Sequence, residues 1–107
     1  MLDYDAYGTN AHTPTALIRL ISTSLGVQFV ERESDYRGAY HVAQASCGRI
    51  EIQPNTIPGD DHSVDLYAPE HPMVGTLLFT ITETPNDEMR DRLSNVDGLV
   101  LLDRETV

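Results

Sequence analysis

Three consecutive segments of this chain alternate apolar and polar side chains, and this pattern restricts the fold more than any other feature. The segments are residues 27–32, 40–43 and 49–53. Alternation with a period of two is typical of β-strands that bury one face. The short polar segments between them contain Gly38 and Gly48, a composition typical of hairpin turns. We therefore predict a three-stranded antiparallel meander.

A helix is predicted before this meander. Thr13 can cap its N-terminus, Pro14 suits the first helical position, and Gly26 can supply the left-handed residue that ends it. Between these signals the apolar residues recur at helical spacing, which places the helix at residues 13–25. The residues before it show no sustained period, and we expect residues 1–12 to be an irregular lead-in.

The last third of the chain predicts a strand, a helix and a final strand. Residues 74–82 form a β-branched and apolar run, which is typical of a strand in the middle of a sheet. A Thr-Pro helix start follows at residue 84, and Gly98 marks the end of the helix before the apolar residues 99–102. Because one helix joins the two strands, we expect these strands to run parallel.

Together these elements predict an α+β fold in the order α-β-β-β-(β)-β-α-β, where the optional element is a short edge strand at residues 64–67. We expect a two-layer sandwich, with a mixed sheet of four or five strands and both helices on one face. Polar residues of the meander, including Gln28, Glu51 and Gln53, should help cover the other face. At 107 residues the chain has the length of a single domain.

Acidic residues outnumber basic residues by 17 to 7, which gives a net charge of -10. Phosphate backbones and anionic lipids attract Lys and Arg, so this charge argues against direct nucleic-acid binding and against adsorption to membranes. Opposite net charge accelerates association, so a basic protein is the favoured partner. The charge is most one-sided between residues 50 and 89, where no Lys or Arg occurs and the acidic residues are Glu51, Asp60, Asp61, Asp65, Glu70, Glu83, Asp87 and Glu88.

The compartment is predicted from two absences in the sequence. No apolar run approaches the roughly 20 residues that cross a bilayer, and the first residues have neither a basic start nor an apolar signal segment. The single cysteine, Cys47, cannot form a disulfide within the chain. We expect a cytoplasmic protein that is a monomer or a weak dimer and uses no cofactor.

The segment around residues 60–71 is the candidate binding surface, because it combines carboxylates with the Pro and Gly content of an exposed loop. A hairpin turn that contains a tyrosine and an arginine is a second candidate, since these residue types are enriched among interface hot spots. The candidate partner-binding residues are Asp60, Asp61, Asp65, Glu70, Tyr36 and Arg37.

Catalytic and metal sites are not predicted. The loop also contains His62 and His71, and carboxylates and imidazoles can bind divalent ions, but the spacing matches neither an EF-hand nor a His-Glu-x-x-His motif. Cys47 and His41 could act as nucleophile and base, yet they lie on either side of a hairpin turn and need not share a face. The sequence contains no nucleophile elbow and no phosphate-binding loop.

These observations predict a small acidic protein-binding module. We expect an inhibitor or immunity-type protein that covers a basic surface of a toxin or of a nucleic-acid-processing enzyme, because enzymes that bind phosphates have positive active sites. The alternative is a small ligand-binding or divalent-metal-binding domain, or an enzyme, that uses the acidic loop at residues 60–71. A third possibility is a homo-oligomer that pairs through an edge strand, which the acidic excess would oppose.

Overall fold

The computed structural model describes residues 2–34, 38–45, 48–57, 65–66, 71, 74–83 and 87–106. The elements follow one another as β1 (Asp3–Thr9), α1 (Pro14–Leu25), β2 (Phe29–Ser34), β3 (Gly38–Ala45), β4 (Gly48–Pro54), β5 (Thr56–Ile57), β6 (Asp65–Leu66), β7 (Thr76–Thr82), α2 (Asp87–Ser94) and β8 (Val100–Thr106). The α+β class that the sequence predicts is confirmed.

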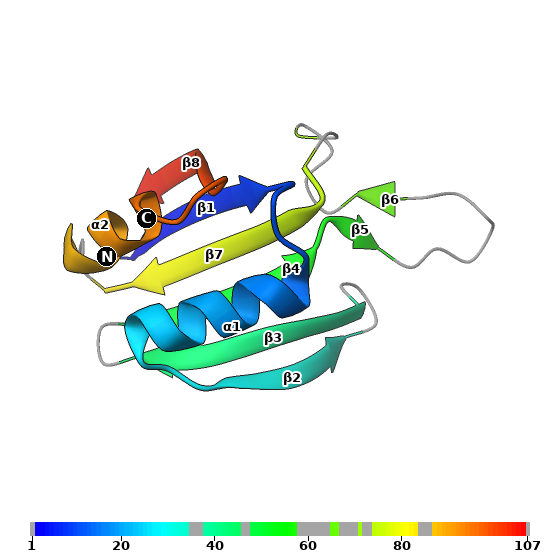
Figure 1. The fold of residues 1–107 in the computed structure, drawn as a ribbon, viewed down its shortest axis with the longest axis horizontal. Coiled ribbons are helices and arrows are strands. Elements are labelled where there is room, and N and C mark those ends of the chain that lie inside the picture. Colours follow the sequence, from blue (N-terminus) through cyan, green and yellow to red (C-terminus); the bar gives the residue numbers. More distant parts are fainter. Residues whose placement is uncertain are drawn as a thin grey trace.

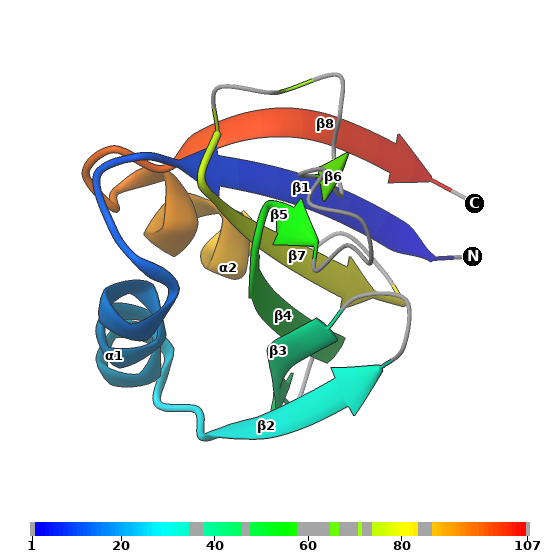
Figure 2. The same ribbon diagram turned by 90° about the vertical axis from the view of Figure 1, so that its right-hand side faces the viewer.

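Six strands form one sheet in the order β2-β3-β4-β7-β1-β8, and β5 and β6 pair separately. Both helices lie on one face of the large sheet, and the β5–β6 pair extends beyond the ends of β4 and β7 (Figure 1). Figure 2, turned by 90° from Figure 1, shows α1 and α2 on the same side of the sheet. The two layers therefore match the predicted sandwich.

The predicted sheet is wrong in two respects. It has six strands instead of four or five, and every neighbouring pair is antiparallel, so the sheet is not mixed. The strands β7 and β8 do run in the same direction, because both are antiparallel to β1. They are not neighbours, however, since β1 lies between them. The predicted edge strand is present as β6, but it pairs with β5 and not with the large sheet.

The predicted irregular lead-in is also wrong, because residues 3–9 form β1 inside the sheet. In β1 the usual pattern is reversed: acidic side chains point inward and an aromatic side chain points outward. Asp3 and Asp5 are buried, whereas Tyr4 is 38% exposed. A strand that points carboxylates inward does not match the pattern of apolar residues inside and polar residues outside, which is why the segment looked irregular.

The helix α1 has the ends that its sequence predicts. The Thr13 hydroxyl accepts a hydrogen bond from the Ala16 backbone N–H at 3.2 Å, and Gly26 adopts a left-handed conformation with φ of 65°. The helix α2 is shorter than expected and ends at Ser94. Its predicted Thr-Pro start lies outside the described residues. Within the described ranges, no helix combines the length and the apolarity that crossing a membrane would need.

The hydrophobic core lies between the helices and the sheet. Each helix contributes a narrow apolar face, because its buried residues are four positions apart and therefore lie on the same side of the helix. The meander strand β4 contributes Ile50 and Ile52, both fully buried, which confirms the predicted inward face of residues 49–53. The buried apolar residues of this cluster are Tyr7, Leu17, Ile21, Ala43, Ile50, Ile52, Leu78, Met89, Leu93, Val96 and Leu99.

Candidate functional site

The structure does not place most of the predicted binding surface. Asp60, Asp61, Glu70, Tyr36 and Arg37 lie outside the described residues. Asp65 lies in β6, where it is paired with residue 57 of β5. The acidic loop and the Tyr-Arg turn therefore stay predictions, and the arrangement of their side chains does not enter the site described below.

The chain on either side of the acidic loop is held by Asn55. This residue is fully buried, its backbone N–H donates to the Gly75 carbonyl at 2.9 Å, and its side-chain amide donates to the carbonyls of His71 and Val74 at 3.1 and 2.7 Å. The Gly75 N–H in turn donates to Oδ1 of Asn10 at 2.7 Å. The segments that enter and leave the loop are thus joined to each other and to the end of β1.

The face of the sheet opposite the helices carries a pocket. In antiparallel strands, residues directly opposite each other point to the same face. Tyr4 of β1 is opposite Ile81 of β7 and Glu105 of β8, and Phe79 of β7 is opposite Glu51 of β4. These side chains therefore share the face that points away from α1 and α2. The pocket has a volume of about 400 Å³ and is lined by Tyr4, Asp5, Ala6, Glu51, Phe79, Ile81, Asp103 and Glu105.

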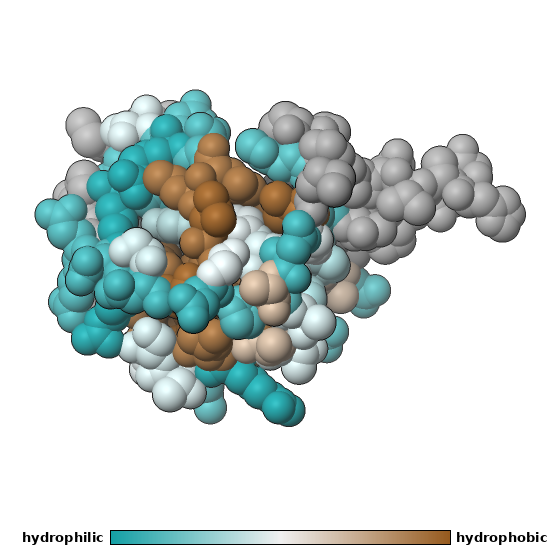
Figure 3. Space-filling model, turned by 45° about the horizontal axis from the view of Figure 1, so that its top comes forward, coloured by the Kyte–Doolittle hydropathy of each residue, from teal (hydrophilic) through white to brown (hydrophobic). Residues whose placement is uncertain are grey.

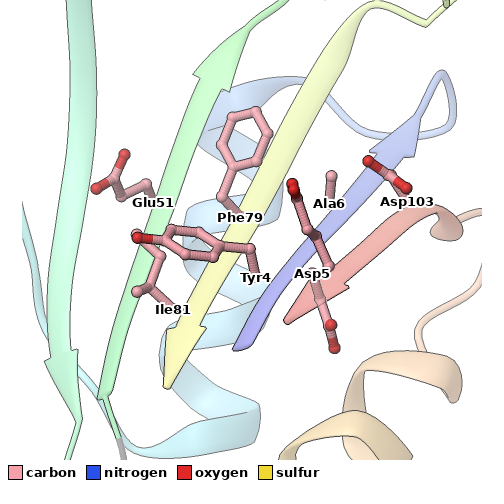
Figure 4. A pocket seen from close by; sticks show the side chains of 8 residues that line it. Tyr4, Asp5, Ala6, Glu51, Phe79, Ile81 and Asp103 are labelled. Carbon is pink, nitrogen blue, oxygen red and sulfur yellow. The ribbon is translucent and has the colours of Figure 1, made fainter. Parts of the chain in front are cut away.

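Two aromatic rings form the middle of this pocket. Figure 4 shows the rings of Tyr4 and Phe79 beside each other, with Glu51 on one side and Asp103 on the other. Ile81 and Phe79 are half-buried, and Tyr4 is exposed enough to meet a ligand. The pocket thus offers aromatic surface between carboxylates from two different strands.

The carboxylates on the two sides differ in how they are neutralised. Glu51 is 6% exposed, and its Oε2 lies 2.9 Å from Nε of Arg49. Asp103 and Glu105 are exposed, and neither forms an ion pair with any residue that the structure describes. Oδ1 of Asp103 accepts a hydrogen bond from the backbone N–H of the next residue, Arg104, at 3.0 Å. The β8 side of the pocket therefore carries negative charge that the described part of the chain leaves unneutralised.

A second polar cluster lies on the other face of the sheet, around Asp5. Its carboxylate is 3% exposed and forms two hydrogen bonds with Arg90 of α2, at 2.9 and 3.3 Å, and two with Arg104 of β8, at 3.1 and 3.3 Å. The Tyr7 hydroxyl donates to the same carboxylate at 3.5 Å. The cluster connects β1 to α2 and β8, and its acceptor oxygens are already used, which points to a structural role.

This cluster also changes the proton affinity of two of its members. Burial raises the pKa of the Tyr7 hydroxyl, and the negative charge of Asp5 raises that pKa further. The hydrogen bond to Asp5 raises the pKa of Arg104, against the opposing effect of burial. Both groups are therefore held in their protonated forms.

Two exposed apolar residues come shortly before the acidic residues of β8 in the sequence. Val100 and Leu101, at the start of β8, are 59% and 42% exposed. Figure 3, which looks onto the top of the molecule, shows a patch of apolar side chains on the surface. Since β8 is an edge of the sheet, exposed apolar residues and carboxylates occur within one edge strand.

No metal centre is found in the described parts of the chain, where no three His, Cys, Asp or Glu side chains form a group that could hold an ion. The predicted alternative, a metal bound by the loop at residues 60–71, lies mostly outside those parts. It therefore stays untested.

Sequence reasoning missed most of the pocket. It placed Glu51 on the face away from the helices, and the structure confirms that face, but Glu51 is buried there and not solvated as expected. It did not single out Tyr4, Phe79, Asp103 or Glu105. The alternation of acidic residues with Arg104 after residue 102 was a usable signal for a longer final strand, but nothing local indicates that β1 brings Tyr4 beside it.

No protein-family model, curated protein or solved structure matches this chain at a significant level.

Proposed function

We propose that this protein is a non-catalytic module that binds a basic protein, and that the partner docks on the open face of the sheet. The observation that supports the proposal is the pocket on that face. Its floor is aromatic, and Asp103 and Glu105 lie on its β8 side without an ion pair among the described residues. A surface that combines aromatic anchors with unneutralised charge suits a complementary protein surface.

The charge of the whole chain favours the same class of partner. A net charge of -10 attracts a basic protein over distances of about one Debye length and increases the rate of encounter. Enzymes that act on nucleic acids carry positive grooves for phosphates. An inhibitor or immunity-type protein that covers such a groove is therefore the specific role that we propose, with the loop at residues 60–71 as a further contact.

The proposal can be tested by affinity capture from a host lysate at about 50 and 300 mM salt, a range over which exposed charge contacts weaken. The test variant combines Asp103→Asn with Glu105→Gln. The matched control combines Asp91→Asn with Asp97→Asn, two exposed residues in and after α2. Both variants lose two negative charges, so overall charge is equal and only the position differs.

We expect one basic protein to be retained at about 50 mM salt by the wild type and by the control variant, and to be lost by the test variant. The retained protein is then purified, and its affinity for all three chains is measured by calorimetry. If the test variant and the control variant bind it equally well, the partner does not dock at the pocket. If no basic protein is retained by the wild type, the binding-module proposal itself fails.

A further inference from the structure

The two sides of the pocket show what kind of group can complete it. On the β4 side, Glu51 is already paired with a guanidinium group, that of Arg49, at 2.9 Å. Arg49 is opposite Ile81 in the sheet, and Glu51 is opposite Phe79, so this internal pair lies on the open face beside the apolar floor. The chain therefore contains one example of an arginine that neutralises a carboxylate on this face.

The β8 side has the carboxylates but not the cation. Asp103 is opposite Ala6, and Glu105 is opposite Tyr4, so both point to the open face two residues apart. All other ion pairs of the described residues use arginines elsewhere: Arg90 and Arg104 bind Asp5 on the helix face, and Arg92 binds Glu88 within α2. Among the described residues, no basic side chain forms an ion pair with Asp103 or Glu105.

The floor between the two sides is aromatic. The rings of Tyr4 and Phe79 lie beside each other between Glu51 and Asp103 (Figure 4). A planar guanidinium group stacks on aromatic faces and donates two parallel hydrogen bonds to a carboxylate, whereas a lysine ammonium is a strongly hydrated point charge. Ring stacking and carboxylate pairing are both available in this pocket, and only arginine uses both in full.

We infer that the pocket binds the guanidinium group of an arginine side chain of the partner, in preference to a lysine ammonium. The arginine lies over Tyr4 and pairs with Asp103 or Glu105 on the β8 side. This inference rests on the proposed function, since it names the group by which the basic partner is recognised. It adds selectivity between two residues of equal charge, which net charge alone does not provide.

The test is an NMR titration of the full chain with two capped tripeptides, acetyl-Gly-Arg-Gly-amide and acetyl-Gly-Lys-Gly-amide, at low salt. The peptides carry the same charge, so a preference between them does not come from net charge. We expect the arginine peptide to shift the amide signals of Tyr4, Ala6, Phe79 and Asp103. Its affinity should exceed that of the lysine peptide about fivefold, the size expected when a cation gains an aromatic face.

Two substitutions of Tyr4 separate stacking from packing. Tyr4→Phe keeps the ring and should keep the preference for arginine. Tyr4→Leu removes the ring, so the two peptides should then bind with about equal affinity. The affinity for the lysine peptide should change little. If Tyr4→Leu does not fold, the wild type and Tyr4→Phe still decide the question, because both must prefer arginine.

The outcomes distinguish the inference from the proposed function. Equal affinity of the two peptides for the pocket would overturn the arginine preference and leave the basic-partner proposal in place. Equal, weak shifts spread over acidic surfaces away from the pocket would overturn both the inference and the assignment of the pocket as the docking site.

Discussion

Asp5 accepts hydrogen bonds from two guanidinium groups that belong to different elements. Arg90 comes from α2 and Arg104 comes from the edge strand β8, while Asp5 itself lies in β1. A buried carboxylate is unfavourable unless it is paired and hydrogen-bonded. One carboxylate thus connects three elements, and removal of its charge leaves two guanidinium groups without their counter-charge.

Substitution of Asp5 should therefore destabilise the fold. Asp5→Asn keeps the size of the side chain but removes its charge, and we expect the free energy of unfolding to fall by about 2 to 3 kcal/mol. This is less than for a fully buried pair, because the side chains of Arg90 and Arg104 are 22% and 42% exposed. Unfolding in urea, followed by circular dichroism, measures the change.

The control for this prediction is Glu88→Gln. It removes the partner of Arg92 in an exposed pair within α2, and such pairs contribute only about 0.5 kcal/mol or less. If Asp5→Asn and Glu88→Gln cost the same, the cluster around Asp5 does not hold the three elements together.

The raised pKa of Tyr7 leads to a prediction about stability at alkaline pH. Burial and the negative charge of Asp5 raise its pKa above the ordinary value of 10.0. Since the folded state holds this proton more tightly than the unfolded state, the contribution to stability is complete below pH 10.0 and is lost as the pH rises through the folded-state pKa. We expect the wild type to lose more stability than Tyr7→Phe between about pH 9 and 11, in urea unfolding at each pH. Parallel losses in the two proteins would contradict this.

At the scale of elements, the contact between β4 and β7 depends on Gly48. A Cβ atom at this position would collide with the carbonyl oxygen of Ile81 and would lie 3.0 Å from Cα of Thr82. Both are backbone atoms of β7, so they cannot rotate away as a side chain can. The close approach of the two strands at this end of the sheet therefore requires glycine.

Gly48→Ala should destabilise the fold by about 2 to 3 kcal/mol, because the strand must shift to admit the methyl group. Gly26→Ala is the comparison. Gly26 also has a positive φ, but its Cβ would meet no atom within 4 Å, so only the backbone strain of about 1 kcal/mol remains. Thermal and urea unfolding measure both. A smaller loss for Gly48→Ala than for Gly26→Ala would show that β4 and β7 separate easily.

The elements that the sequence predicts correctly are those with local signals. The cap and end residues of α1, the alternation of β4 and the apolar run of β7 each specify their own segment. The strand β1 could not be predicted in this way. Its inward carboxylates are compensated by Arg90 and Arg104, which are far away in the sequence, so its polarity makes sense only after the chain has folded.

Most of the pocket could not be predicted from local signals either. Glu51 could be placed on the open face from the alternation of one strand, but the other walls come from β1, β7 and β8. Their order in the sheet depends on the insertion of β1 between β7 and β8, which no local pattern specifies. The acidic character of the surface was therefore predictable, whereas the aromatic floor beneath it was not.

At the scale of the whole molecule, most of the basic charge is used internally. Arg49, Arg90, Arg92 and Arg104 each pair with a carboxylate of the same chain. With 17 acidic and 7 basic residues in total, the remaining surface is strongly negative. These four arginines therefore form contacts within the chain, and the acidic excess makes two copies of the chain repel each other electrostatically.

The place of β1 in the sheet also restricts the order in which the strands can pair. The ribosome makes β1 before the other strands of the sheet, yet both of its neighbours, β7 and β8, belong to the last third of this sequence. The β2–β3–β4 meander pairs strands that are close in sequence and can form early, while β1 must wait for long-range partners. Since β1 and β8 supply two of the four strands that line the pocket, the pocket forms only after β8 has paired with β1.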